Sequence, residues 1–178
     1  MPGYIVAIDP GLRHAGVAVL DPAGLLIAAL CVRARERSDD PVALNASVSA
    51  YVTKFVRASV SADQPLEVVA EWPRVYGRGK SKGDPADLLP LAGCSSACVA
   101  RLRPDTARAV RPDEWKGQAP TDTVVRARVE ARLSPAERLV LQRALDEAGK
   151  THGHDVLDAV GIALWAAGRF DPHRAVAR

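Results

Sequence analysis

Long hydrophobic runs are missing from this sequence. No stretch approaches the roughly 20 consecutive apolar residues that a membrane-spanning helix needs. The start of the chain, Met1 to Tyr4, has neither the basic flank nor the apolar segment of a secretory signal. We therefore expect a protein that works in the cytoplasm.

Cysteine and net charge are also scarce. The 178 residues include 3 cysteines, an odd number that offers no disulfide framework, and Cys94 and Cys98 lie in an apolar run. The 24 basic and 21 acidic residues leave a net charge of +3, and 48% of the residues are hydrophobic. Disordered chains have less apolar content. We expect a single domain over residues 1–178, with these reduced cysteines in its core.

The first part of the chain predicts three strands followed by a crossover. Apolar runs joined by short turns predict strands at residues 4–8, 16–20 and 25–32. A capping residue and a proline then begin a helix predicted over residues 41–59, which leads to a buried strand at residues 66–70. Short connections make the first three strands an antiparallel meander, and a right-handed crossover makes the fourth parallel to the first.

The second part of the chain is mostly helical. A weaker strand is predicted at residues 107–111. Helices are predicted at residues 88–102, 122–132 with Asp122 as its cap, 135–148 with Gly149 as its stop, and 154–167. The predicted fold class is α/β, with a five-stranded mixed sheet, three strands antiparallel and then two parallel, flanked by helices.

Four carboxylates are the candidate catalytic and metal-binding residues. Asp9 and Glu71 each end a buried strand, and parallel neighbours about 4.8 Å apart would bring both acids to one edge of the sheet. Asp155 and Asp158 are three residues apart, so they share a helical face that continues into apolar residues. Clustered carboxylates raise one another's pKa unless cations compensate them. Such oxygen ligands suit Mg²⁺ or Mn²⁺, and a pair of these ions is the usual apparatus for phosphodiester hydrolysis.

A basic segment follows Glu71 directly. Residues 72–83 contain four positive charges, no negative charge and three glycines. Its candidate DNA-binding residues are Arg74, Tyr76, Arg78, Lys80 and Lys82. Their charges suit phosphates, and the aromatic ring suits stacking on a base. A merely solvated loop is the alternative interpretation.

Other clusters have simpler interpretations. His152 and His154 could be combined with Cys94 and Cys98 as a zinc site, but the helical cysteine spacing and its apolar surroundings favour core packing. Trp115 is equally suited to packing or to binding. Each of the four acids, taken alone, is also typical of a turn or of a helix start.

Three segments together resemble a known family. Residues 5–16, 68–71 and 155–162 resemble, in the correct order, the three active-site blocks of RuvC-like Holliday junction resolvases, which have a ribonuclease H-like fold. Segments similar to the phage and prophage branch of that family are residues 71–76, 82–89 and 114–118. The helix at residues 135–148 looks like extra material compared with the cellular resolvases.

The resemblance implies a Mg²⁺-dependent endonuclease for branched DNA, acting as a homodimer with two active sites in a bacterial or phage-infected cell. It assigns metal binding to Asp9, Glu71, Asp155 and Asp158. In our hypothesis Asp9 is shared by two ions, Glu71 and Asp158 hold one each, and Asp155 or His154 orients the attacking water. Some members have His at the position of Asp155, so the choice between Asp155 and its neighbour His154 stays open.

Three other functions fit parts of the pattern. A nuclease of the same fold could process structured RNA, and a junction-binding protein could have little activity. An actin-like ATPase also has an Asp-x-Gly loop after a strand, but it needs two such domains and this chain has room for one.

Overall fold

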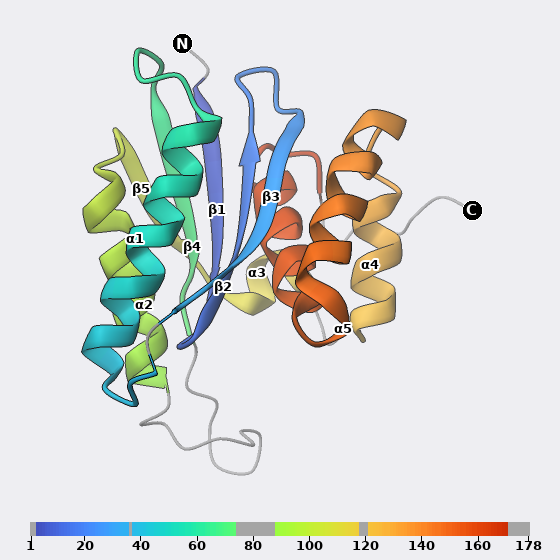
Figure 1. The fold of residues 1–178 in the computed structure, drawn as a ribbon. Coiled ribbons are helices and arrows are strands. Elements are labelled where there is room, and N and C mark those ends of the chain that lie inside the picture. Colours follow the sequence, from blue (N-terminus) through green and yellow to red (C-terminus); the bar gives the residue numbers. More distant parts are fainter. Residues whose placement is uncertain (1–2, 36, 74–87, 118–120, 171–178) are drawn as a thin grey trace.

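A computed structural model describes residues 3–35, 37–73, 88–117 and 121–170. Figure 1 shows a central sheet with helices on both faces. Helices α1 (Pro41–Ser59) and α2 (Leu88–Leu102) pack against each other on one face. Helix α5 (Pro135–Ala166) packs on the other face, and α4 (Asp122–Glu130) packs on α5. The central sheet therefore has a separate helical layer on each side.

The sheet has the predicted order and directions. Its strands are β1 (Tyr4–Pro10), β2 (His14–Leu20), β3 (Leu26–Arg33), β4 (Leu66–Glu71) and β5 (Thr106–Val110). They lie in the order β3-β2-β1-β4-β5, antiparallel from β3 to β1 and parallel from β1 to β5. The predicted five-stranded mixed sheet is confirmed.

Alternation along the strands produces two hydrophobic cores. Val6 and Ile8 of β1 face α1 and α2, whereas Ala7 between them faces α5. Cys94 and Cys98 of α2 are fully buried in the core beside α1, and both are free thiols. This confirms them as reduced core residues, on the opposite face of the sheet from α5.

Capping fixes the helix starts. Asp40 accepts a hydrogen bond from the backbone N–H of Val42 at the start of α1. At the start of α5, Ser134 and Glu137 form the predicted capping box. The cap of α4 differs from the prediction: Asp122 is the first helical residue, and Thr121 is the N-cap.

Two helical regions differ from their predicted bounds. Helix α5 contains one non-helical residue, Gly149, with φ 71° and ψ −179°, and the second helical segment follows it at once instead of beginning at residue 154. Gly149 alone turns the chain, because a left-handed φ is easily adopted only by glycine. The short helix α3 (Pro112–Lys116) was not predicted. Within the described ranges, no helix is long and apolar enough to cross a membrane.

Candidate active site

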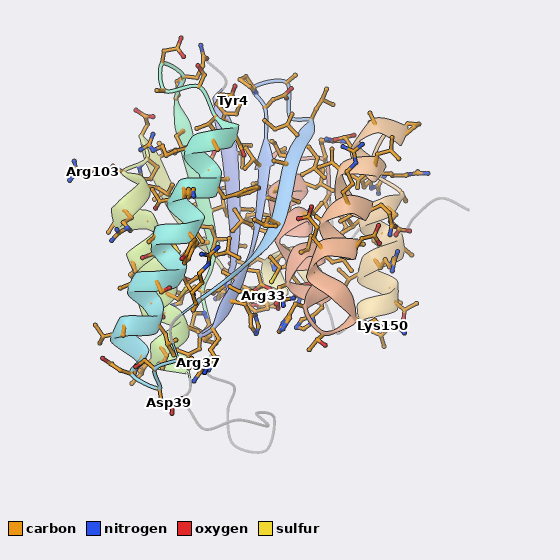
Figure 2. The ribbon with its side chains drawn as sticks, in the orientation of Figure 1. Tyr4, Arg33, Arg37, Asp39, Arg103 and Lys150 are labelled. Carbon is orange, nitrogen blue, oxygen red and sulfur yellow. The ribbon has the colours of Figure 1, made fainter. Side chains whose placement is uncertain are left out.

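The four predicted acids come from β1, β4 and α5. Asp9 is two residues after Ala7 of β1, and Glu71 is two residues after Val69 of β4, so both acids are on the α5 side of the sheet. In Figure 2, the label Tyr4 shows the end of β1 that lies away from the site. The label Arg33, at the end of β3, shows the end of the sheet that carries the site. Arg33 donates a 2.7 Å hydrogen bond to the carbonyl of Ala148, which ties this end of the sheet to the turn at Gly149.

Gly16 brings α5 close to the sheet. It pairs with Asp9 in the β1–β2 register, and a Cβ on Gly16 would lie only 1.9 Å from the backbone oxygen of Asp155. Only glycine permits this approach. Asp155 and Asp158 follow on the same side of α5, with Asp155 only 7% exposed. The helix backbone is thus seated directly beside the strand residue that opposes Asp9.

The charges of the other three acids act on Asp9. Burial raises the pKa of Asp9 well above its ordinary value, and the charges of Glu71, Asp158 and Asp155 raise it further, in that order. Lys116 opposes this shift. Burial likewise raises the pKa of Glu71. The predicted convergence of four carboxylates is therefore visible in the electrostatics of Asp9.

Helix α3 supplies two partners for these acids. The indole Nε1 of Trp115 donates a 2.7 Å hydrogen bond to Oε2 of Glu71. The ammonium group of Lys116 forms an ion pair with Oδ2 of Asp158. Burial lowers the pKa of Lys116, but the charge of Asp158, its hydrogen bond and the charges of Glu71 and Asp9 outweigh burial and raise it. A protonated lysine thus lies among the carboxylates.

Asp155 has a different environment from the other acids. Its Oδ2 lies 2.8 Å from Nδ1 of His14 and 3.7 Å from Nδ1 of His152, and its Oδ1 lies 3.0 Å from Nε2 of His154. Burial raises the pKa of Asp155, but His14, His154 and His152 outweigh it and hold this pKa below its ordinary value. The sequence predicted mutually raised pKa values, and for Asp155 the histidines reverse the direction.

The donor set fits a hard divalent cation. Asp9, Glu71 and Asp158 offer carboxylate oxygens, the ligands that Mg²⁺ and Mn²⁺ prefer. Burial raises the pKa of Asp9, and the negative charges of Glu71, Asp158 and Asp155 raise it further, while Lys116 opposes them. A divalent cation would compensate this charge more fully.

The chain is similar to RuvC proteins in sequence and in structure. No family model matches it. A crossover junction endodeoxyribonuclease RuvC of Salinibacter ruber (strain DSM 13855 / M31) is 28% identical over 176 residues, which cover 95% of this chain and 87% of the relative. Among solved structures, T. thermophilus RuvC in complex with a Holliday junction substrate matches with a TM-score of 0.55 and 15% identity, over 93% of this chain and 92% of the other.

A yeast mitochondrial resolvase has a similar structure. The Holliday junction resolvase Ydc2 matches with a TM-score of 0.54 and 14% identity, over 94% of this chain and 82% of the other. The predicted ribonuclease H-like fold is confirmed by these structural matches. The chain thus resembles RuvC in sequence and in fold.

The structure of this RuvC-like chain brings together some predicted residues and leaves others outside the described part. The four acids gather as predicted, and His154 is half-exposed beside Asp155. The predicted DNA-binding residues Arg74, Tyr76, Arg78, Lys80 and Lys82 lie outside the described residues. The zinc alternative is wrong for Cys94 and Cys98, because they pack on the other face of the sheet.

Sequence reasoning missed the site roles of Trp115 and Lys116. Both residues lie in segment 114–118, which resembles the family, so this resemblance was a sequence signal that the segment belongs to the site. The contacts of Trp115 with Glu71 and of Lys116 with Asp158 join positions more than 40 residues apart in sequence, and nothing local indicates them.

Proposed function

We propose that this chain is a divalent-metal-dependent endonuclease that cuts four-way DNA junctions or closely related branched DNA. The observation that carries the proposal is the gathering of Asp9, Glu71, Asp155 and Asp158 around one end of a ribonuclease H-like sheet. The similarity to a crossover junction endodeoxyribonuclease over 95% of the chain supports the choice of substrate. The proposed reaction is hydrolysis of a phosphodiester bond.

In this proposal Asp9, Glu71 and Asp158 hold the metal, and Asp155 is the fourth carboxylate of the metal site. Two Mg²⁺ or Mn²⁺ ions would stabilise negative charge on the phosphate and supply a nucleophile at neutral pH. Trp115 fixes the direction of the Glu71 carboxylate through its 2.7 Å hydrogen bond. Lys116 holds Asp158 and balances the acids before metal arrives.

His154 is the second candidate for orienting water. Its side chain is 52% exposed, and its Nε2 lies 3.0 Å from Oδ1 of Asp155. A proton on this imidazole would reside at the edge of the acid cluster, within reach of solvent. Asp155 and His154 are therefore both candidates for orienting the attacking water.

Substrate binding and assembly complete the proposal. The basic residues Arg74, Tyr76, Arg78, Lys80 and Lys82 would contact the DNA backbone and a base. A homodimer would place two active sites on the two opposed strands of one junction, in the cytoplasm of a bacterium or of a phage-infected cell. The spacing of two sites would then select junctions over linear duplex.

The test is a cleavage assay on a panel of labelled substrates. Purified protein is incubated with four-way, three-way, flap and linear DNA and with structured RNA, with Mg²⁺ or with a chelator. We expect symmetrical Mg²⁺-dependent cuts in the four-way junction and little cutting of linear DNA. Cutting of RNA in preference to junctions would favour the RNA-processing alternative, and junction binding without cutting would favour a binding protein.

A further inference from the structure

A second cluster of side chains of metal-ligand types includes Asp155 but none of Asp9, Glu71 and Asp158. His14 begins β2, Cys31 lies in β3, and His152 and Asp155 lie in the second segment of α5. One ligand atom from each of these four residues lies within 4.8 Å of every other. The imidazole rings of His14 and His152 have centroids 4.1 Å apart.

The fold builds this cluster from residues that are separate in sequence. Gly16 pairs with Cys31, and His14 pairs with Arg33, so His14 and Cys31 are diagonal neighbours on the face covered by α5. Because Gly16 has no side chain, α5 seats Asp155 between them. His152 is three residues before Asp155, on the same face of α5.

Two buried imidazole nitrogens in the cluster have no hydrogen bond. The Nδ1 atoms of His14 and His152 are both buried, and neither is aligned for a hydrogen bond with any residue that the structure describes. Both nevertheless lie near the same oxygen, Oδ2 of Asp155, at 2.8 Å and 3.7 Å. Cys31 Sγ is 3.9 Å from that oxygen. Two buried imidazole nitrogens and a buried thiol thus lie around one carboxylate oxygen.

We propose that His14, Cys31, His152 and Asp155 form a binding site for a transition-metal ion of the Zn²⁺ class. Imidazole nitrogen, thiolate sulfur and carboxylate oxygen are the ligand types that bind Zn²⁺ in proteins, and four of them complete its usual coordination. Tetrahedral bonds of ordinary length give ligand-to-ligand distances of about 3.3–3.6 Å. The three contacts of 2.8 to 3.9 Å around Oδ2 bracket this value, and all four atoms lie within 4.8 Å of one another, so the side chains are near enough to share one ion once they adjust to it.

This site differs chemically from the proposed nuclease site. Asp9, Glu71 and Asp158 offer only oxygen, whereas this cluster offers two nitrogens, a sulfur and one oxygen. A soft thiolate selects Zn²⁺-like ions over Mg²⁺. Cys31 loses its thiol proton when it becomes a ligand, so metal binding releases a proton. Asp155 is the shared residue, and a metal on its Oδ2 would change the charge that acts on Asp9.

The test uses Co²⁺ as a spectroscopic substitute for Zn²⁺ in the full-length, metal-free protein. We expect a near-ultraviolet thiolate-to-cobalt charge-transfer band and the intense visible bands of four-coordinate Co²⁺, both saturating at one equivalent. Added Zn²⁺ should abolish both signals. Absence of the charge-transfer band in the parent protein would overturn the proposal.

Three variants distinguish this site from the proposed nuclease site and from the other cysteines. Cys31→Ser should lose the charge-transfer band and weaken Zn²⁺ binding by at least about a hundredfold, because it removes a direct ligand. His152→Asn should weaken binding comparably, and its partly exposed side chain keeps the test available if Cys31→Ser does not fold. Asp9→Asn should keep the band, since Asp9 is not a ligand here. A band that persists in Cys31→Ser would assign the thiolate to Cys94 or Cys98 and refute the site.

Discussion

The indole nitrogen of Trp115 donates a 2.7 Å hydrogen bond to the carboxylate of Glu71. Trp115 is fully buried, and its ring occupies space that a side chain at position 161 would need: a Cβ on Gly161 would lie 2.3 Å from the ring. Helix α5 thus accommodates the indole, and the indole fixes the acid at the end of β4. Packing on α5 and the position of Glu71 are thus linked through one side chain.

Trp115→Phe should shift the pH dependence of cutting. Burial raises the pKa of Glu71, and the Trp115 hydrogen bond lowers it in part. Without this donor the pKa of Glu71 rises further, so the carboxylate that must bind metal becomes protonated at higher pH. We expect cutting at neutral pH to fall about tenfold, consistent with loss of a hydrogen bond to a charged group. A pH–rate profile checks this.

Trp165→Phe is the matched control for that profile. The Trp165 ring packs under the guanidinium of Arg108, 4.9 Å from the ring centroid, and not against Glu71. The acid limb of the pH–rate profile of Trp165→Phe should coincide with that of the parent protein. If Trp115→Phe also coincides with the parent, the indole does not tune Glu71.

Lys116→Gln should make the protein more dependent on Mg²⁺ for stability. Lys116 balances the charges of Asp158, Glu71 and Asp9 in the metal-free protein. Removing it leaves these acids uncompensated, which we expect to lower the free energy of unfolding in chelator by about 1–3 kcal/mol. The rise in melting temperature on adding Mg²⁺ should then be larger than in the parent.

Thermal unfolding with chelator and with Mg²⁺ measures both effects. Lys54→Gln is the control, because Lys54 is exposed on α1, away from the acids. An equal Mg²⁺-induced rise in Lys116→Gln and in the parent would mean that Lys116 does not compete with the metal.

Glu137→Gln should remove a part of the acid sensitivity of folding. Burial raises the pKa of Glu137, but hydrogen bonds from Arg169, Leu26 and Ser134 outweigh it and lower the pKa to about 2. A depressed carboxyl pKa stabilises the fold above the unfolded value of 4.5, and this contribution disappears as the pH falls towards 2. We expect Glu137→Gln to cost about 3 kcal/mol at neutral pH and progressively less below about pH 4.

Urea unfolding at neutral pH and at about pH 3 checks this convergence. Glu130→Gln is the control, because its ion pair with Arg126 is exposed and contributes at most about 1 kcal/mol. A constant difference between Glu137→Gln and the parent across this pH range would contradict the charge-based explanation.

The sheet could be predicted because its signals are local. Uninterrupted apolar runs and turn residues mark β1 and β4, and a crossover between them requires that Asp9 and Glu71 emerge at one edge. The break in α5 at Gly149 could also be predicted from the sequence. Helix α3 was missed because five residues are too few to show a helical period.

The environment of each acid depends on tertiary contacts that the sequence does not display. His14 and Cys31 are on different strands and approach Asp155 only because Gly16 lets α5 come close. The sequence therefore predicted four similar carboxylates, whereas histidines surround Asp155 and a lysine pairs with Asp158. The basic segment 74–82 stays a prediction.

The most direct test of the proposed active site compares Asp9→Asn with the parent protein on a labelled four-way junction in Mg²⁺. This change removes the charge on which the other acids act and nearly preserves side-chain shape. We expect cutting to fall by about a thousandfold or more, while junction binding stays close to that of the parent. The same variant should melt at a higher temperature in chelator, because Asp9's raised pKa makes its ionised form destabilising at neutral pH. Near-normal cutting by Asp9→Asn, with binding retained, would contradict the assignment of this carboxylate cluster as the nuclease site.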